Sequence, residues 1–110
     1  MISIESEERP WGRFFVLHDE PNYKLKRIEV NPKGKLSYQY HFKRSEIWVI
    51  VQGVAEVKID DIITRHTIGD VVRISEEQKH QPKNIGDDDL IFIEIQKMKH
   101  GKKVNHQVEK

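Results

Sequence analysis

Hydrophobic and polar residues alternate along most of this chain in the pattern typical of β-strands. In residues 23–30, Leu25 and Arg27 fall on one face of an extended chain, and Lys26 and Ile28 fall on the other. No stretch repeats its apolar residues at the helical period of about 3.6 residues. The pattern therefore predicts an all-β chain.

The predicted strands are short and evenly spaced. Clusters of Gly, Pro, Asn and Asp separate them about every ten residues, as in β-sandwiches and β-barrels. We expect one such domain over residues 1–98, followed by a polar, loosely ordered tail over residues 99–110. The expected strands cover residues 13–17, 23–30, 36–41, 47–51, 54–59, 62–65, 71–74 and 90–95.

Residues 47–51 are apolar on both faces of their predicted strand. Such a strand is usually covered on both sides. One face would point into the barrel. The other face would be covered by the N-terminal segment or by a second subunit.

The charge balance argues against one broad class of partners. The chain has 110 residues, and its 19 Lys and Arg against 18 Asp and Glu give a net charge of +1. A general binder of nucleic acid or of anionic membranes carries a basic excess on one face. No apolar run approaches the roughly 20 residues of a membrane span. We therefore expect neither nucleic acid nor a membrane among the partners.

The absence of cysteine narrows the chemistry. Disulfides, thiolate metal sites, iron–sulfur clusters and cysteine nucleophiles are excluded. The ligands left for a divalent metal ion are His, Asp, Glu and amide oxygens. Residues 1–10 are acidic and lack the basic and apolar regions of a secretory signal, so we expect a cytoplasmic protein.

Two segments supply a set of residue types that can bind a metal. Gln39 and His41 share a face of one predicted strand, and Glu46 lies at the start of the next. If the sheet closes into a barrel, His80 can meet them in its mouth. Two imidazoles, a carboxylate and an amide oxygen suit Zn, Mn, Fe, Co or Ni and leave positions open for water or substrate. Taken singly, each residue also fits an ordinary polar surface position, so the joint spacing carries the argument.

That joint spacing resembles the cupin family, whose fold is a jelly roll or double-stranded β-helix barrel. The first cupin motif has two histidines separated by one residue, followed by a glutamate and then a glycine. Here Gln39, His41, Glu46 and Gly53 follow this spacing, with glutamine in place of the first histidine. The resemblance implies that the first three of these residues are metal ligands.

The second cupin motif is also recognisable. Gly69, His80 and Asn84 keep its spacing, while Ser75 and Glu77 replace its proline and glycine. The two replacements affect a turn and leave the histidine in place. The resemblance therefore implies that His80 completes the metal site.

Longer stretches of sequence point to one branch of the cupins. Residues 9–12 read Arg-Pro-Trp-Gly, and residues 36–41 and 44–49 read Leu-Ser-Tyr-Gln-Tyr-His and Arg-Ser-Glu-Ile-Trp-Val. These stretches resemble the C-terminal domain of bacterial type II mannose-6-phosphate isomerases, which is often fused to a mannose-1-phosphate guanylyltransferase. That branch uses glutamine at the first ligand position, as Gln39 does here. The resemblance covers residues 9–96.

The chain departs from this branch near the site and at its end. Phe42 and Lys43 replace a histidine-rich stretch, and Ile47 stands where the branch has a histidine before the tryptophan. Residues 99–106 lack the acidic-then-basic ending near Tyr-Gly-Arg. If that ending supplies an arginine to the substrate, this chain must use another residue or do without.

The resemblance implies interconversion of mannose 6-phosphate and fructose 6-phosphate. The reaction needs a metal or dipole to polarise the carbonyl, a base to move a proton between C2 and C1, and cations for the phosphate. Candidate phosphate partners are Arg44, Lys26 and Arg27, and only one of the last two can point inward. Trp48 shares the inward face with Glu46, as a core aromatic or a platform for the sugar. No base can be assigned from the sequence.

Three functions remain open at this level. The first is a phosphosugar isomerase, which would turn over mannose 6-phosphate with a redox-inert metal. The second is a metal-binding cupin of other activity, because two histidines and one carboxylate also suit non-haem iron oxygen chemistry. The third is a sugar-binding module without turnover.

The resemblance also bears on assembly. Cupins commonly pair through their sheets, and the two-sided apolar strand over residues 47–51 agrees with such pairing. We therefore expect a homodimer with two-fold symmetry.

Overall fold

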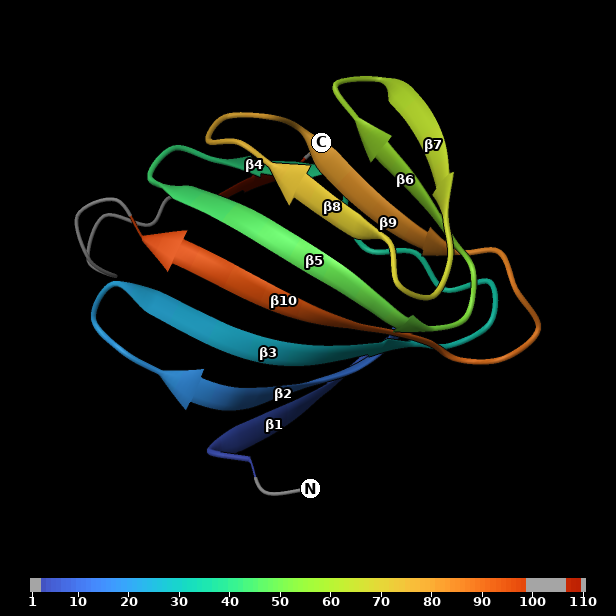
Figure 1. The fold of residues 1–110 in the computed structure, drawn as a ribbon, viewed down its shortest axis with the longest axis horizontal. Helices are drawn as coiled ribbons and strands as arrows, with labels where there is room; N and C mark the ends of the chain where they lie inside the picture. Colours follow the sequence, from blue (N-terminus) through green and yellow to red (C-terminus); the bar gives the residue numbers. More distant parts are fainter. Residues whose placement is uncertain (1–2, 99–106, 110) are drawn as a thin grey trace.

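The strands form two antiparallel sheets whose inner faces share one hydrophobic core (Figure 1). The computed structural model describes residues 3–98 and 107–109. The first sheet contains, in spatial order, β1 (Glu5–Arg9), β2 (Gly12–Asp19), β3 (Tyr23–Val30), β10 (Leu90–Met98), β5 (Arg44–Gln52) and β8 (Val71–Ile74). The second contains β11 (Gln107–Glu109), β4 (Gln39–His41), β9 (His80–Asn84), β6 (Ala55–Ile59) and β7 (Ile62–His66).

The prediction of an all-β chain is confirmed, since the described residues form strands and turns. Accordingly, no helix within residues 3–98 or 107–109 has the length and apolar character needed to cross a membrane. The predicted strand over residues 36–41 is shorter in the structure, where only Gln39–His41 is a strand.

The alternation pattern missed three strands. β1 is exposed at every position, so it has no apolar face to reveal it. β9 contains Pro82, a residue that argues against a strand when the sequence is read alone. β11 lies in the segment expected to be a tail and pairs with β4. The rest of that tail, residues 99–106 and Lys110, lies outside the described residues.

The inward face of β5 changes character along its length. Arg44, Glu46, Trp48 and Ile50 are all buried and succeed one another on this face. β10 shows the same change, because its inward residues run from Leu90 and Phe92 to Glu94 and Gln96. The strands pair so that polar residues lie beside polar residues, as in the register Gln96↔Glu46. One end of the sandwich is therefore a hydrophobic core, and the other is a buried polar site.

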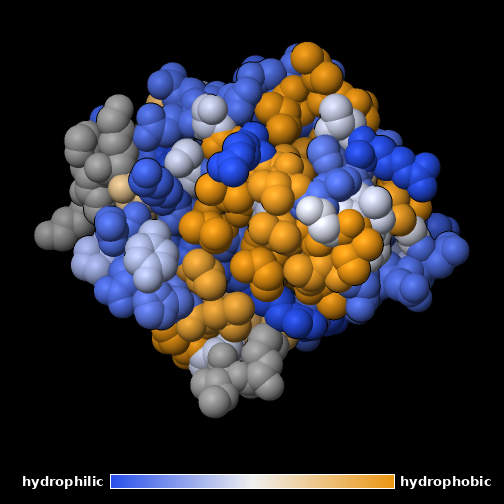
Figure 2. All heavy atoms as spheres, viewed as in Figure 1, coloured by the Kyte–Doolittle hydropathy of each residue, from blue (hydrophilic) through white to orange (hydrophobic). Residues whose placement is uncertain are grey.

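The N-terminal segment was one of the two alternatives expected to cover the outward face of β5, the other being a second subunit. The described N-terminal segment does not lie over it, because β1 and β2 extend the same sheet beyond β3. That part of the expectation is wrong. Val51 keeps 39% of its surface exposed and Val71 on the neighbouring strand keeps 48%. In the view of Figure 2, apolar side chains gather over the region of β5 and β8.

The two aspartates that interrupt the run between β6 and β7 form a two-residue hairpin turn. Asp60 and Asp61 have φ angles of 47° and 70°. Positive φ at both central residues is the condition for a two-residue turn of type I′, which matches the twist of the paired strands. The sequence break at this point is thus a turn.

Candidate metal centre

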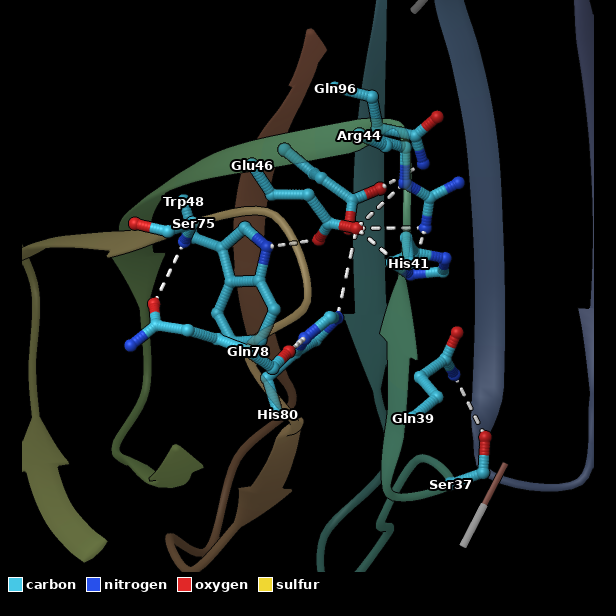
Figure 3. A network of polar contacts seen from close by, with 11 residues as sticks. Ser37, Gln39, His41, Arg44, Glu46, Trp48, Ser75, Gln78, His80 and Gln96 are labelled. Atoms are coloured by element: carbon cyan, nitrogen blue, oxygen red, sulfur yellow. Dashed lines mark hydrogen bonds and ion pairs between the residues drawn. The ribbon is translucent and has the colours of Figure 1, made fainter. Parts of the chain in front are cut away.

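The predicted metal ligands come from three strands that meet at the polar end of the sandwich. His41 ends β4, Glu46 lies near the start of β5, and His80 begins β9 (Figure 3). The three residues are 1%, 2% and 4% exposed. β4 and β9 are held together by the register Gln39↔His80, which brings the second motif next to the first.

The three side chains point their donor atoms at one another. Glu46 Oε2 lies 3.3 Å from His41 Nε2 and 3.7 Å from His80 Nε2. One ligand atom from each residue falls within 4.8 Å of the others. Two imidazoles and one carboxylate in such a cluster form a donor set that suits borderline divalent metals.

Hydrogen bonding orients the two imidazoles differently. His80 Nδ1 lies 2.9 Å from the carbonyl oxygen of Gln78, so it can donate there and leave the Nε2 lone pair directed at the cluster. His41 Nδ1 is buried and has no hydrogen-bond partner among the described residues. Burial also lowers the pKa of His41. The nitrogen of His41 that faces the cluster is Nε2, 3.3 Å from Glu46 Oε2, and a neutral imidazole carries a lone pair that can bind a metal. The chemistry of the donor set therefore fits a divalent metal ion.

Glu46 is held in place at both oxygens. Arg44 Nε donates to Oε2 over 2.9 Å, and Trp48 Nε1 donates to Oε1 over 2.8 Å. Burial by itself would raise the pKa of Glu46, but the hydrogen bond with His41 and the charge of Arg44 hold it well below its usual value. Glu46 is therefore an ionised carboxylate, as a metal ligand must be.

Gln39 lies apart from this cluster. It lines the same cavity, but its Nε2 donates to Ser37 Oγ over 2.8 Å. Its role as a fourth ligand stays a prediction.

The cluster opens into a cavity of about 480 Å³ through Glu46 and His80. Among the residues predicted to contact substrate, Lys26, Arg44 and Trp48 line this cavity. Arg27 does not. Its Nε donates to Glu29 Oε2 over 2.7 Å on the other face of β3, so Arg27 is the one of the two alternatives, Lys26 and Arg27, that does not line the cavity. The alternation of the strand decides this, because Lys26 takes the inward position.

Two buried polar residues that line the cavity were not predicted from the sequence. Glu94 and Gln96 line it from β10, and Gln96 Nε2 donates to Glu94 Oε1 over 2.7 Å. Burial and the nearby charge of Glu46 raise the pKa of Glu94 to about 8. Their position in the strand could have revealed them, because both lie on the same face of β10 as the buried residues Leu90 and Phe92. Polar residues on an otherwise buried face are the exception that marks a site.

Comparison with known proteins agrees with this arrangement. The family model described as mannose-6-phosphate isomerase C-terminal matches residues 4–106. The chain belongs to this family. The resemblance stated from the sequence is thereby confirmed.

The curated relatives of this mannose-6-phosphate isomerase C-terminal domain are much longer proteins. Mannose-1-phosphate guanylyltransferases of Salmonella muenchen and Escherichia coli (strain K12) are 38% identical over 88 residues and 37% identical over 87 residues. The alignments cover 80% and 79% of this chain but 19% and 18% of those relatives. The chain thus spans about a fifth of their length, and their activity does not transfer to it.

Solved structures confirm the cupin fold. A Klebsiella pneumoniae protein with a double-stranded β-helix domain has a TM-score of 0.77 at 18% identity, over 86% of this chain and 80% of that one. A sugar phosphate isomerase of the cupin superfamily from Silicibacter pomeroyi has a TM-score of 0.72 at 18% identity, over 77% and 58% of the two chains. At such identities the likeness shows the fold alone.

Proposed function

We propose that this domain is a metal-dependent aldose–ketose isomerase that interconverts mannose 6-phosphate and fructose 6-phosphate. The observation that supports it most is the buried cluster of His41, Glu46 and His80, which opens into the cavity. The cluster lies in a member of the mannose-6-phosphate isomerase C-terminal family. The cavity volume of about 480 Å³ falls in the range of small-molecule sites.

The three clustered residues would hold the metal, with Gln39 as the predicted fourth ligand. A bound divalent ion would supply a Lewis acid for the sugar carbonyl and for the enediolate oxygen. The protein itself holds the ligands in a fixed orientation. The hydrogen bonds from Arg44 and Trp48 fix the carboxylate of Glu46 in this way.

Proton transfer between C1 and C2 needs a group outside the cluster. Glu94 is the other carboxyl that lines the cavity, beside Glu46, and Gln96 orients it through a hydrogen bond of 2.7 Å. We assign the proton-carrying role to Glu94 on this position. Glu94 also forms a side-chain hydrogen bond with Glu46. A carboxyl that lines the cavity and is not itself a ligand could exchange a proton with the sugar.

A second function is favoured by the donor set itself. Two histidines and one carboxylate also suit non-haem iron and oxygen chemistry. The two functions differ in what they consume, because an isomerase needs no oxygen and an oxygenase does.

The test is a coupled assay of fructose 6-phosphate formation from mannose 6-phosphate, with protein loaded in turn with Zn, Mn, Co and Ni. We expect turnover that is lost in His80→Ala together with bound metal, measured by elemental analysis. His18→Ala is the matched control, because His18 is an exposed histidine on β2. If the iron-loaded protein consumes oxygen and no isomerisation occurs, the second function, iron and oxygen chemistry, is supported in place of the isomerase. No turnover with any of these metals, despite full loading, would overturn the isomerase.

A further inference from the structure

Lys26 is an unusual cation in this structure. It occupies an inward position on β3, in register with Glu94 on β10, and lines the cavity. Its Nζ lies 4.4 Å from the centre of the Phe14 ring. It forms no ion pair with any residue within the described part of the chain. Burial lowers the pKa of Lys26, and the nearby charges of Glu94 and Glu46 offset only part of this effect. A bound anion would stabilise the ammonium group further.

Arg9 reaches the same aromatic ring from another element. It ends β1, at the turn into β2, and its Cζ lies 5.5 Å from the centre of the Phe14 ring. Arg9 also lines the cavity, and its ion pair with Glu7 is at the surface, where such pairs contribute little. Two long cationic side chains thus converge on Phe14 at the wall of the cavity.

Arg44, one of the three cations that the sequence offered as phosphate partners, is already engaged. Its Nε and a terminal nitrogen donate to Glu46 over 2.9 and 2.8 Å, and that terminal nitrogen also contacts His41 Nε2. Moving it to an incoming anion would leave a buried carboxylate without its cation, which is strongly destabilising. Arg44 is therefore a positioning residue for the metal cluster.

We infer that Lys26 and Arg9, packed against Phe14, form an anion subsite that takes the phosphate group of the substrate. The cavity then has two ends, a metal end for the hydroxyl and carbonyl groups and a cationic end for the phosphate. A phosphate oxygen accepts from ammonium and guanidinium donors in short, charge-assisted hydrogen bonds. The identity of the anion as a sugar phosphate rests on the proposed function, whereas the presence of the subsite does not.

Binding to the metal-free protein tests the subsite without the metal end. Trp11 and Trp48 line the cavity, so their fluorescence can report titrations with inorganic phosphate, mannose 6-phosphate and mannose. We expect Lys26→Gln and Arg9→Gln each to weaken mannose 6-phosphate about tenfold, the loss of one hydrogen bond to a charged group, and to leave mannose unchanged. Lys26→Arg should retain most of the affinity. Lys83→Gln, which removes a charge from the exposed side of β9, is the matched control.

The outcomes separate this inference from the proposed function. Mannose 6-phosphate binding that is the same in Lys26→Gln, Arg9→Gln and the unaltered protein would overturn the subsite, even if isomerisation persists. Binding that depends on these two residues without isomerisation would support the subsite and count against the isomerase. Circular dichroism confirms that each variant is folded, and the two single variants on separate strands test the subsite independently of each other.

Discussion

Replacing Arg44 with methionine removes the buried cation that neutralises Glu46. The carboxylate is 2% exposed and takes hydrogen bonds from Arg44 over 2.9 and 2.8 Å. Removing one partner of a buried ion pair costs about 3–5 kcal/mol, because the other charge stays buried without compensation. A domain of this size has a free energy of unfolding of about 5–15 kcal/mol. We therefore expect Arg44→Met to lose about a fifth or more of its free energy of unfolding and to melt on the order of 15 °C lower.

Chemical denaturation of the metal-free protein at pH 7, followed by tryptophan fluorescence, measures this loss. The double variant Arg44→Met/Glu46→Gln removes both charges and should recover much of the stability, because no unpaired carboxylate remains. The reasoning is refuted if Arg44→Met unfolds within about 1 kcal/mol of the unaltered protein, which is the range of an exposed pair. It is also refuted if the double variant is no more stable than Arg44→Met.

Three further predictions concern the surface, the cavity and assembly. Burial would raise the pKa of Glu29, but hydrogen bonds from Arg13 and Arg27 outweigh it and leave the pKa lowered. Glu29→Gln should therefore cost up to about 1 kcal/mol at pH 7, and the difference should vanish in denaturation curves as the pH falls from about 4.3 through the folded-state pKa. Glu94→Gln should reduce isomerase turnover about a hundredfold while bound metal, measured by elemental analysis, is unchanged; unchanged turnover would remove Glu94 from the mechanism. The homodimer expected from the sequence stays a prediction, and the exposed apolar side chain of Val71 is where it can be tested: sedimentation at micromolar concentration should show a dimer that Val71→Lys dissociates, and a monomeric unaltered protein would contradict this.

Strand alternation and motif spacing were enough to predict the class of fold and three of the four residues proposed as metal ligands that the structure brings together; the fourth, Gln39, stays a prediction. His41, Glu46 and His80 lie together in the structure, as their spacing predicted. Such residues are recognisable because the pleat ties side-chain direction to position along a strand, and the motif ties the strands to one another. The alternation also showed that Lys26 and Arg27 lie on opposite faces of β3.

Which face is the inner one, and what each side chain meets there, depended on the pairing of strands distant in sequence. The amino acid order cannot show that Glu94 and Gln96 of β10 lie beside Trp48 and Glu46 of β5, since the register follows from how the whole sheet packs. It also cannot show that Arg44 is committed to Glu46 and so is unavailable to an anion. Local alternation assigns residues to faces, whereas contacts between strands tens of residues apart are decided by burial of the common core. For this reason the ligand types were readable from the sequence, while the partners that set their charge and orientation emerged only from the tertiary structure.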